Sequence, residues 1–248
     1  MKNLFLTLTL CLSFIISNAQ EVFILSPIIV ADEDKDDFES IQSKYVSPLA
    51  QDAVDDKSMK GWVLLKRMAG FGSPDNKMNY LWVTVFDNIN QMVNAKQWWE
   101  DTESKYGIPS EILYDGYELE GRGNYVYKTE RQIETEVPGK YVIFNWATPK
   151  DVAKMIDLQA DVEKHFRKNI IKSGMVGWGM ATRIIPQAKD RSTAFWWDVY
   201  DSMENTMEHL AGGAAVEGLS KEHLSEFNEN VPNGWDNRVI FEIMTGTQ

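Results

Sequence analysis

The second half of this chain repeats the first, and an internal repeat decides the fold before any local feature does. Matching residues recur at an offset that drifts only from 117 to 114 along the chain, so few insertions separate the two copies. The matched pairs are Gln42 and Gln159, Met59 and Met175, Gly61 and Gly177, Trp62 and Trp178, Arg67 and Arg183, Trp82 and Trp196, Val85 and Val199, and Asp87 and Asp201. Such ordered matching indicates two copies of one structural unit.

Each copy is predicted to contain, in order, a strand, a helix, two strands, a helix and a strand. Apolar runs predict the strands, and a stripe of apolar residues at helical spacing predicts the long helix of the second copy. In the first copy we expect strands over Val22–Val30, Trp62–Met68, Asn79–Phe86 and Tyr125–Gln132, and helices near Phe38–Ala53 and Ile89–Trp99. In the second we expect strands over Tyr141–Trp146, Trp178–Ile185, Thr193–Tyr200 and Arg238–Met244, and helices over Lys150–Ile171 and around Met203–Leu210.

The N-terminus has the pattern of a secretory signal. Lys2 precedes the apolar run Leu4–Ile16, and small residues follow at Ser17–Ala19. The run is shorter than the roughly 20 residues of a membrane-spanning helix. We therefore expect a signal peptide over residues 1–19, repeats over 20–135 and 136–248, and a secreted or periplasmic protein; a membrane anchor or a lipid anchor at Cys11 is the alternative. Cys11 is the only cysteine, so the mature chain would have no thiol chemistry.

Charge and composition argue against several classes of function. The net charge of −12, without a strongly basic stripe, disfavours nucleic acid and anionic membranes as partners. The acidic run Asp32–Asp37 is typical of a solvated loop leading into a helix, with a cation site as the alternative. The three histidines lack the spacing of a metal site, and no serine lies in a nucleophile motif, so we expect no metal and no serine nucleophile.

A unit of this order forms a four-stranded antiparallel sheet with both helices on one face. Period-two alternation divides the third strand of each copy into two faces. One face is uniformly apolar, which predicts that the helices cover it: Leu81, Val83 and Val85, with Phe195, Trp197 and Val199. The other face carries large aromatic residues with a polar group between them: Trp82, Thr84 and Phe86, with Trp196, Asp198 and Tyr200. We expect the two aromatic faces to shield each other and to enclose a barrel-like interior.

This pattern resembles the dimeric α/β-barrel superfamily of ferredoxin-like folds, with two units fused in tandem. The resemblance implies an α+β protein in which two βαββαβ sheets pack face to face as a pseudo-dimeric barrel. We predict that the enclosed pocket is lined by Trp82, Trp178, Arg183, Trp196, Asp198 and Tyr200. Trp98 and Trp99 are adjacent on an expected helix and cannot both face one core, so one of them is available to the partner repeat, another subunit or a ligand.

Asp198 is the carboxyl group with the most suggestive surroundings. An aromatic interior would raise its pKa towards the range of a general base, whereas pairing with Arg183 would keep it ionised as a structural group. The first repeat has Thr84 at the equivalent position. That asymmetry is expected if one half kept a site and the other became scaffold, and neutral drift predicts it too.

The segment from Trp197 to Asp201, continued by Glu208–Leu210, is similar to the strand-to-helix stretch of the antibiotic-biosynthesis-monooxygenase branch. The similarity implies cofactor-independent oxygenation of a small molecule, or haem breakdown with His209 as iron ligand and Asn145 near the substrate. The first repeat has Ala95 in place of His209. Helical spacing places His209 about 120° from the stripe of Met203, Met207 and Leu210, which predicts a surface histidine.

The sequence therefore predicts a protein that binds a small apolar or aromatic molecule in an aromatic-lined interior. The alternatives are a cofactor-independent monooxygenase or haem-degrading enzyme, with Asp198 or His209 as the catalytic group, and a protein-assembly module. Haem is the only cofactor that the resemblance implies. The chain is expected either to close on itself as a monomer or to form a homodimer.

Overall fold

The computed structural model describes residues 20–69, 77–113, 123–212 and 219–247, so the predicted signal peptide lies outside the described residues. Its strands form one closed barrel in the order β1-β3-β2-β8-β5-β7-β6-β4, and each neighbouring pair is antiparallel. The strands are β1 (Val22–Ile28), β2 (Gly61–Arg67), β3 (Tyr80–Phe86), β4 (Tyr125–Glu134), β5 (Tyr141–Ala147), β6 (Met175–Ile185), β7 (Ala194–Tyr200) and β8 (Asn237–Gly246).

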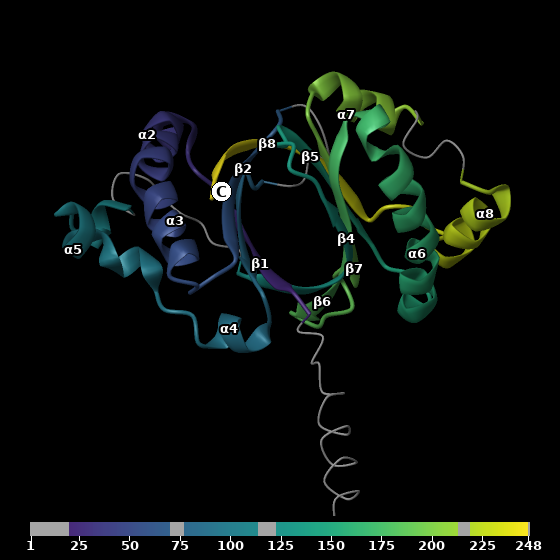
Figure 1. Cartoon of the computed structure of the whole chain (residues 1–248), viewed down its shortest axis with the longest axis horizontal. Helices are drawn as coiled ribbons and strands as arrows, with labels where there is room; N and C mark the ends of the chain where they lie inside the picture. The colour runs from purple at the N-terminus through teal and green to yellow at the C-terminus, as the bar shows by residue number, and fades with distance from the viewer. Residues whose placement is uncertain (1–19, 70–76, 114–122, 213–218, 248) are drawn as a thin grey trace, which may run out of the picture.

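The helices lie outside the barrel in two groups, one on each side (Figure 1). The first group comprises η1 (Asp32–Asp34), α2 (Lys35–Ile41), η2 (Gln42–Val46), α3 (Ser47–Asp55), α4 (Ile89–Val93), η3 (Trp98–Asp101), α5 (Thr102–Tyr106) and η4 (Ser110–Leu113). The second comprises α6 (Val152–Asn169), η5 (Ile170–Ser173), α7 (Met203–Leu210) and α8 (Lys221–Asn230). Within the described part of the chain, no helix has the length and apolar character needed to cross a membrane.

The barrel is built from two four-stranded sheets joined at both edges. The first sheet has the order β4-β1-β3-β2 and the second the equivalent order β8-β5-β7-β6. Strand β2 pairs with β8, and β4 pairs with β6, so hydrogen bonds close the ring and leave no open sheet edge. The predicted α+β pseudo-dimeric barrel is confirmed. Because both halves share one continuous sheet, the division between residues 135 and 136 stays a prediction.

Buried residues gather in three layers. One layer fills the inside of the barrel, and the other two lie between each four-stranded sheet and its own helices. This arrangement buries both faces of strands such as β5 and β7. Helical cover on the outside and facing strands on the inside are what allow an eight-stranded barrel to be apolar on both sides.

The predicted faces of the third strands are reversed in the structure. Leu81, Phe195 and their alternate neighbours point into the barrel, whereas Trp82 and Trp196 lie under helices. The expectation that the aromatic faces meet across the interior was therefore wrong. With buried residues on both faces of these strands, alternation separates two apolar sets but does not indicate which set the helices cover.

The first helical segment differs between the two repeats. In the second repeat α6 runs unbroken for 18 residues, after its N-cap Asp151 accepts a hydrogen bond from the Lys154 backbone. In the first repeat the same stretch is α2, a single π-helical stretch η2, and α3, with Pro48 in the first turn of α3. Proline has no N–H to donate, which breaks the regular hydrogen-bond ladder, and π-helical turns of this kind are frequent at functional sites.

Candidate functional site

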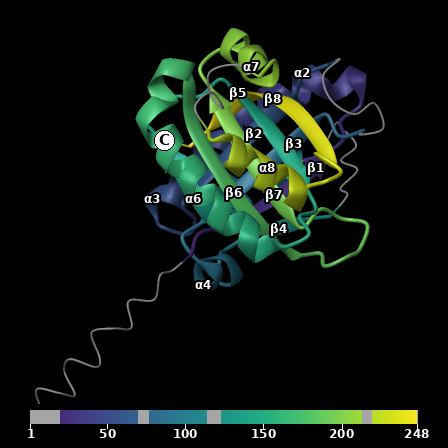
Figure 2. The same cartoon turned by 90° about the vertical axis from the view of Figure 1, so that its right-hand side faces the viewer.

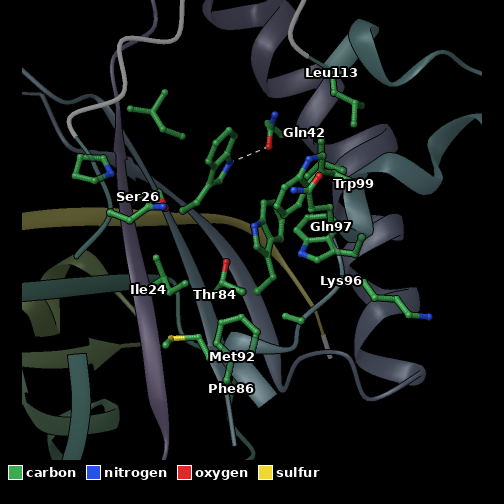
Figure 3. Close-up of a pocket in the computed structure, with 18 of the residues that line it drawn as sticks. Ile24, Ser26, Gln42, Thr84, Phe86, Met92, Lys96, Gln97, Trp99 and Leu113 are labelled. Atoms are coloured by element: carbon green, nitrogen blue, oxygen red, sulfur yellow. Dashed lines mark hydrogen bonds between the residues drawn. The ribbon is translucent and has the colours of Figure 1, made fainter. Parts of the chain in front are cut away.

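A cavity of about 650 Å³ lies between the first sheet and the helical segments that cover it (Figure 3). Strands β1, β2 and β3 form one wall, and η2, α4, η3 and η4 contribute to the other. Small-molecule sites in proteins typically have volumes of about 300–1,000 Å³. This first-repeat cavity is lined by Ile24, Ser26, Pro27, Ile28, Gln42, Val46, Trp62, Trp82, Thr84, Phe86, Met92, Ala95, Lys96, Gln97, Trp98, Trp99, Leu113, Gly123 and Asn124.

Four tryptophans dominate the lining: Trp62 and Trp82 come from the sheet, and Trp98 and Trp99 come from η3. The ring of Trp98 lies 6.3 Å from that of Trp62 and 5.6 Å from that of Trp99, with the planes at 72° and 81°. Edge-to-face contacts of this kind hold the rings in place and leave flat apolar surfaces for a further aromatic group. Trp98 and Trp99 thus both reach one cavity, contrary to the expectation that they face different surroundings.

The polar groups of the cavity are few and almost all neutral. Buried Gln42 accepts a hydrogen bond from the Trp82 indole, with 3.0 Å between Nε1 and Oε1. The Ser26 hydroxyl donates to the Asn124 side-chain oxygen at 2.7 Å. Lys96 is the one charged residue among the described lining, and its exposed side chain points away from the cavity in Figure 3. The arrangement can recognise shape and hydrogen-bonding groups more readily than charge.

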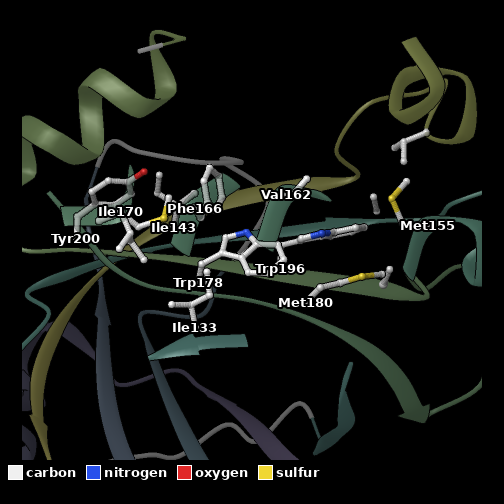
Figure 4. Packing of buried hydrophobic residues seen from close by; sticks show 14 of the residues in the cluster. Ile133, Ile143, Met155, Val162, Phe166, Ile170, Trp178, Met180, Trp196 and Tyr200 are labelled. Atoms are coloured by element: carbon white, nitrogen blue, oxygen red, sulfur yellow. The ribbon is translucent and has the colours of Figure 1, made fainter. Parts of the chain in front are cut away.

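The equivalent layer of the second repeat is packed with side chains (Figure 4). Trp196 makes the same contact as Trp82, donating its indole hydrogen to Gln159 Oε1 at 3.1 Å. On its other side the Trp196 ring packs 5.1 Å from Trp235, which precedes β8. Trp178, the counterpart of Trp62, is 2% exposed and packs edge-on against Phe166 of α6. Figure 2 shows α6 and α8 side by side over this sheet.

A buried polar cluster lies beside that packed layer, centred on Asp198 of β7. Asn145 donates to Asp198 Oδ2 at 2.8 Å, and His209 Nε2 lies 3.9 Å from the same oxygen. Arg238 in turn donates to Asn145 Oδ1 at 2.6 Å. Burial raises the pKa of Asp198, while His209, Arg238 and the Asn145 hydrogen bond oppose that rise. The direction of the predicted pKa shift is confirmed, although helix packing rather than a barrel interior causes it.

The structure separates Arg183 from Asp198, whereas Tyr200 stays close to the Asp198 cluster. Arg183 was expected to be able to pair with Asp198, but its guanidinium donates to the backbone oxygens of Ala188 and Arg191, at one end of the barrel. Arg238 takes that place near Asp198. Tyr200 is fully buried on the helix-covered side, where its ring lies 5.6 Å from that of His209. Burial raises the pKa of the Tyr200 hydroxyl far above its usual range.

His209 is not the surface residue that helical spacing predicted, since its side chain is only 12% exposed and faces β7. The reason is that the buried stripe of α7 is centred on Thr206, while Met207, which the prediction placed in the core, is 40% exposed. Thr206 can be buried because its hydroxyl donates to the Ser202 backbone oxygen at 2.8 Å. Rotating the stripe by one residue turns His209 towards the sheet.

Of the six predicted ligand-binding residues, Trp82 alone lines the first-repeat cavity. Trp178, Trp196, Asp198 and Tyr200 belong to the covered layer of the second repeat, and Arg183 closes one end of the barrel. The prediction missed Gln42, Trp62 and Thr84 as lining residues. A signal for Gln42 was present, because the Gln42–Gln159 and Trp82–Trp196 pairs recur together and each glutamine bonds its tryptophan.

The residues around the first-repeat cavity do not fit a haem. Haem iron takes an axial His, Cys, Tyr or Met ligand from the protein. The described lining offers only Met92 among these types, and Ala95 stands where the second repeat has His209. His209 itself is directed at Asp198. Across the described residues, no group of three or more His, Cys, Asp or Glu side chains could hold a metal ion.

No family model matches this sequence, and the comparison with curated proteins found no match. Solved structures do share its architecture. A candidate monooxygenase from Fusobacterium nucleatum superimposes with a TM-score of 0.57 at 9% identity, covering 93% of this chain and 95% of that one. A candidate monooxygenase from Lactobacillus acidophilus gives 0.53 at 16% identity, with 92% and 96% covered. A mutant chlorite dismutase from Candidatus Nitrospira defluvii gives 0.53 at 6% identity, with 92% of each chain covered.

An anthrone oxidase-like protein is also similar, with a TM-score of 0.50, 10% identity and 93% of each chain covered. At such identities the likeness concerns the path of the chain and carries no statement about chemistry. The coverage extends over both repeats, and the strand order agrees with the pattern read from the sequence. This chain has the dimeric α/β-barrel fold, with both ferredoxin-like halves of the barrel in a single polypeptide.

Proposed function

We propose that the first-repeat cavity binds a planar, largely apolar aromatic molecule that carries a carbonyl or hydroxyl oxygen. The observation that carries the proposal is the lining of four tryptophans around a buried glutamine. Aromatic side chains bury a large area and select flat partners by edge and face contacts. A volume of about 650 Å³ accommodates several fused rings.

The polar lining residues are the reason for proposing a ligand with a carbonyl or hydroxyl oxygen. The Oε1 atom of Gln42 accepts the hydrogen bond of the Trp82 indole, which fixes the orientation of the side-chain amide in the cavity wall. Thr84 adds a hydroxyl on the same strand as Trp82. A carbonyl or hydroxyl oxygen would meet these groups, and an uncharged ligand needs no charged partner. A few well-placed polar groups in an apolar pocket are the usual basis of specificity.

The test is a titration with 1,8-dihydroxyanthraquinone, followed by quenching of tryptophan fluorescence. We expect saturable quenching of the wild-type protein. Ala95→Trp fills the cavity from its edge and should weaken binding at least about tenfold, a loss of about 1.4 kcal/mol. Trp196→Phe changes the matching position of the packed repeat and serves as the control, with an affinity within about twofold of wild type.

The reverse result would overturn the proposal. If Trp196→Phe abolished binding and Ala95→Trp left it unchanged, the ligand would bind in the second repeat. Far-ultraviolet circular dichroism of each variant establishes that the comparison is made between folded proteins.

A second candidate function is oxidation of a small aromatic molecule by dioxygen in the second repeat. It is favoured by the names of the monooxygenase and anthrone oxidase-like neighbours. Asp198 and His209 are the proposed acid–base pair for such chemistry, so the substrate would bind beside them rather than in the first-repeat cavity. Incubating anthrone with the protein in air and following anthraquinone absorbance tests this candidate. Formation no faster than without protein, or unchanged in Asp198→Asn, would leave binding as the function.

We also propose that the protein acts outside the cytoplasm, as a secreted or periplasmic binding protein. The support is the signal-like pattern of residues 1–19. Mass spectrometry of protein recovered from the culture medium or periplasm of the expressing cells should give a chain that begins at Gln20. Recovery from the cytoplasm with Met1 still present would contradict this proposal.

A further inference from the structure

The inside of the barrel is filled unevenly along its length. Large side chains that point inwards near the middle are almost fully buried: Phe23, Leu25, Phe144, Phe195 and Phe241. Towards one end, inward-pointing residues are only half-buried: Val63, Val83, Val85, Trp197, Val199 and Ile243. An eight-stranded barrel is just wide enough either to be filled by side chains or to hold one small ligand. Partial exposure of inward-facing residues shows that this end holds unfilled space.

That space is a second cavity, of about 340 Å³, which we call the barrel cup. Its floor includes the rings of Phe23, Phe195 and Trp197, which contact one another at centroid distances of 5.6 to 5.9 Å. Its walls are mainly aliphatic side chains from β2, β3, β7 and β8. The cup and the first-repeat cavity lie on opposite faces of β3, because Val83 and Val85 alternate with Trp82 and Thr84.

Hydrogen-bonded side chains occupy the other end of the barrel. Arg183 donates to the backbone oxygens of Ala188 and Arg191, at 3.3 and 2.8 Å. Trp146 donates its indole hydrogen to the Tyr127 hydroxyl at 3.3 Å. A ligand that enters the cup would meet the aromatic floor before it reached these residues.

The rim of the cup carries more negative than positive charge. Lys60 contacts the carboxylate of Glu21, which also accepts a hydrogen bond from Gln132 at 3.3 Å. Glu134 is 66% exposed in its side chain and lies 3.7 Å from Lys60. Glu21 and Glu134 thus share one ammonium group. A bound carboxylate would have to displace Glu21 from Lys60, whereas a cation would meet an under-neutralised Glu134.

We propose that the barrel cup binds the unbranched alkyl chain of a cationic amphiphile, an alkylammonium, with its head group at the Glu134 side of the rim. On β2 the lining runs from Gly61 through Val63 to Leu65. At about 3.4 Å per residue this is roughly 14 Å along the strand, close to the length of an extended chain of about ten carbons. The smaller volume and the mainly aliphatic wall favour a linear chain over the fused rings that suit the first-repeat cavity.

The experiment is methyl NMR on the mature full chain with labelled valine and isoleucine, titrated with decylammonium chloride below its micelle concentration. We expect saturable shifts of the Val83, Val199 and Ile243 methyl groups. Ile24 and Val46 line the first-repeat cavity and should not shift. Absence of saturable shifts, or shifts centred on Ile24 and Val46, would overturn the proposal.

Two further comparisons test the charge and the position. Sodium decanoate should bind at least about tenfold more weakly than decylammonium, and equal affinities would contradict the role given to the rim. Glu134→Gln should weaken decylammonium binding about two- to fivefold, as expected for one exposed ion pair. Glu222→Gln, an exposed change on α8, is the matched control and should have no effect. An equal effect of both changes would show that net charge alone is responsible.

Val83→Phe fills the cup from its wall and should abolish the shifts at Val199 and Ile243. If the variant retains wild-type affinity, the chain does not enter the cup. If the variant fails to fold, the methyl shifts of the wild-type protein and the comparison of Glu134→Gln with Glu222→Gln still test the proposal on folded protein.

Discussion

Each repeat has a four-stranded sheet and a tryptophan that is hydrogen-bonded to a glutamine. Only the first repeat has a large cavity beside this tryptophan–glutamine pair. In the second repeat α6 is continuous, and Trp235 and Phe227 close over Trp196. In the first repeat the matching helical segment passes through the π-helical stretch η2, and Trp98 and Trp99 lie across a cavity from Trp82. The comparison suggests how a duplicated unit can divide its roles. One copy keeps an unfilled layer, while the other packs the same layer and stabilises the barrel.

The largest expected effect is on stability, in the packed repeat. Trp178→Ala removes a fully enclosed ring and should lower the free energy of unfolding by about 3–5 kcal/mol. Trp62 is the counterpart of Trp178 and borders the cavity. Trp62→Ala should therefore lower the free energy of unfolding by about 1–2 kcal/mol less than Trp178→Ala, because the Trp62 ring has fewer contacts on the cavity side. Urea denaturation measures both. Equal losses would mean that the first-repeat cavity is closed in solution.

A smaller difference is expected for the two glutamines. Gln159→Leu leaves the buried Trp196 N–H without a partner and should cost about 1–3 kcal/mol. Gln42→Leu leaves the Trp82 N–H beside a cavity that water can enter, so about 0.5–1.5 kcal/mol is expected. Thermal unfolding of the two variants in parallel tests the order. If Gln42→Leu lowered the free energy of unfolding more than Gln159→Leu, water would enter the layer of the second repeat rather than the cavity of the first.

The Asp198 cluster should make stability depend on pH. Because folding raises the pKa of Asp198, the folded protein holds this proton more tightly than the unfolded chain. This group's contribution is most favourable below the unfolded-state pKa of about 3.9, and it is lost as the pH rises through the folded-state pKa. Asp198→Asn keeps the shape and removes the titration. Its unfolding free energy relative to wild type should therefore increase with pH across this interval, and a constant difference would show that the pKa is not raised.

The smallest effect should come from Lys96, the charged residue at the edge of the first-repeat cavity. Its side chain is exposed and directed away from the lining tryptophans (Figure 3). Lys96→Ala should change the free energy of unfolding by less than about 0.5 kcal/mol. The dissociation constant for 1,8-dihydroxyanthraquinone should change by less than about twofold. A large loss of affinity would mean that the ligand is anionic rather than neutral.

The repeat was enough to predict the order of the strands and the closed barrel, because each unit has one way to bury its sheet. It did not predict which face the helices cover. Phe195 and Trp196 are neighbours that are both buried, so hydrophobicity could not separate the two faces.

The candidate site was predictable only in part. Trp82 was singled out because it is large and repeated, but it was placed inside the barrel. Trp62 and Gln42 line a cavity that is bounded by η2 and η3, which the repeat did not indicate. Pro48 lies within the helix expected over Phe38–Ala53, directly after the π-helical stretch. His209 was misplaced because one exposed methionine, Met207, was counted in the buried stripe.

A crystal structure of the protein with 1,8-dihydroxyanthraquinone bound would show which repeat holds the ligand. We expect electron density for the ligand between β3 and η3, stacked on the tryptophans and next to the side chains of Gln42 and Thr84. Density under α6 and α7, beside Asp198 and Trp196, would contradict this expectation and would restore the second repeat as the binding half.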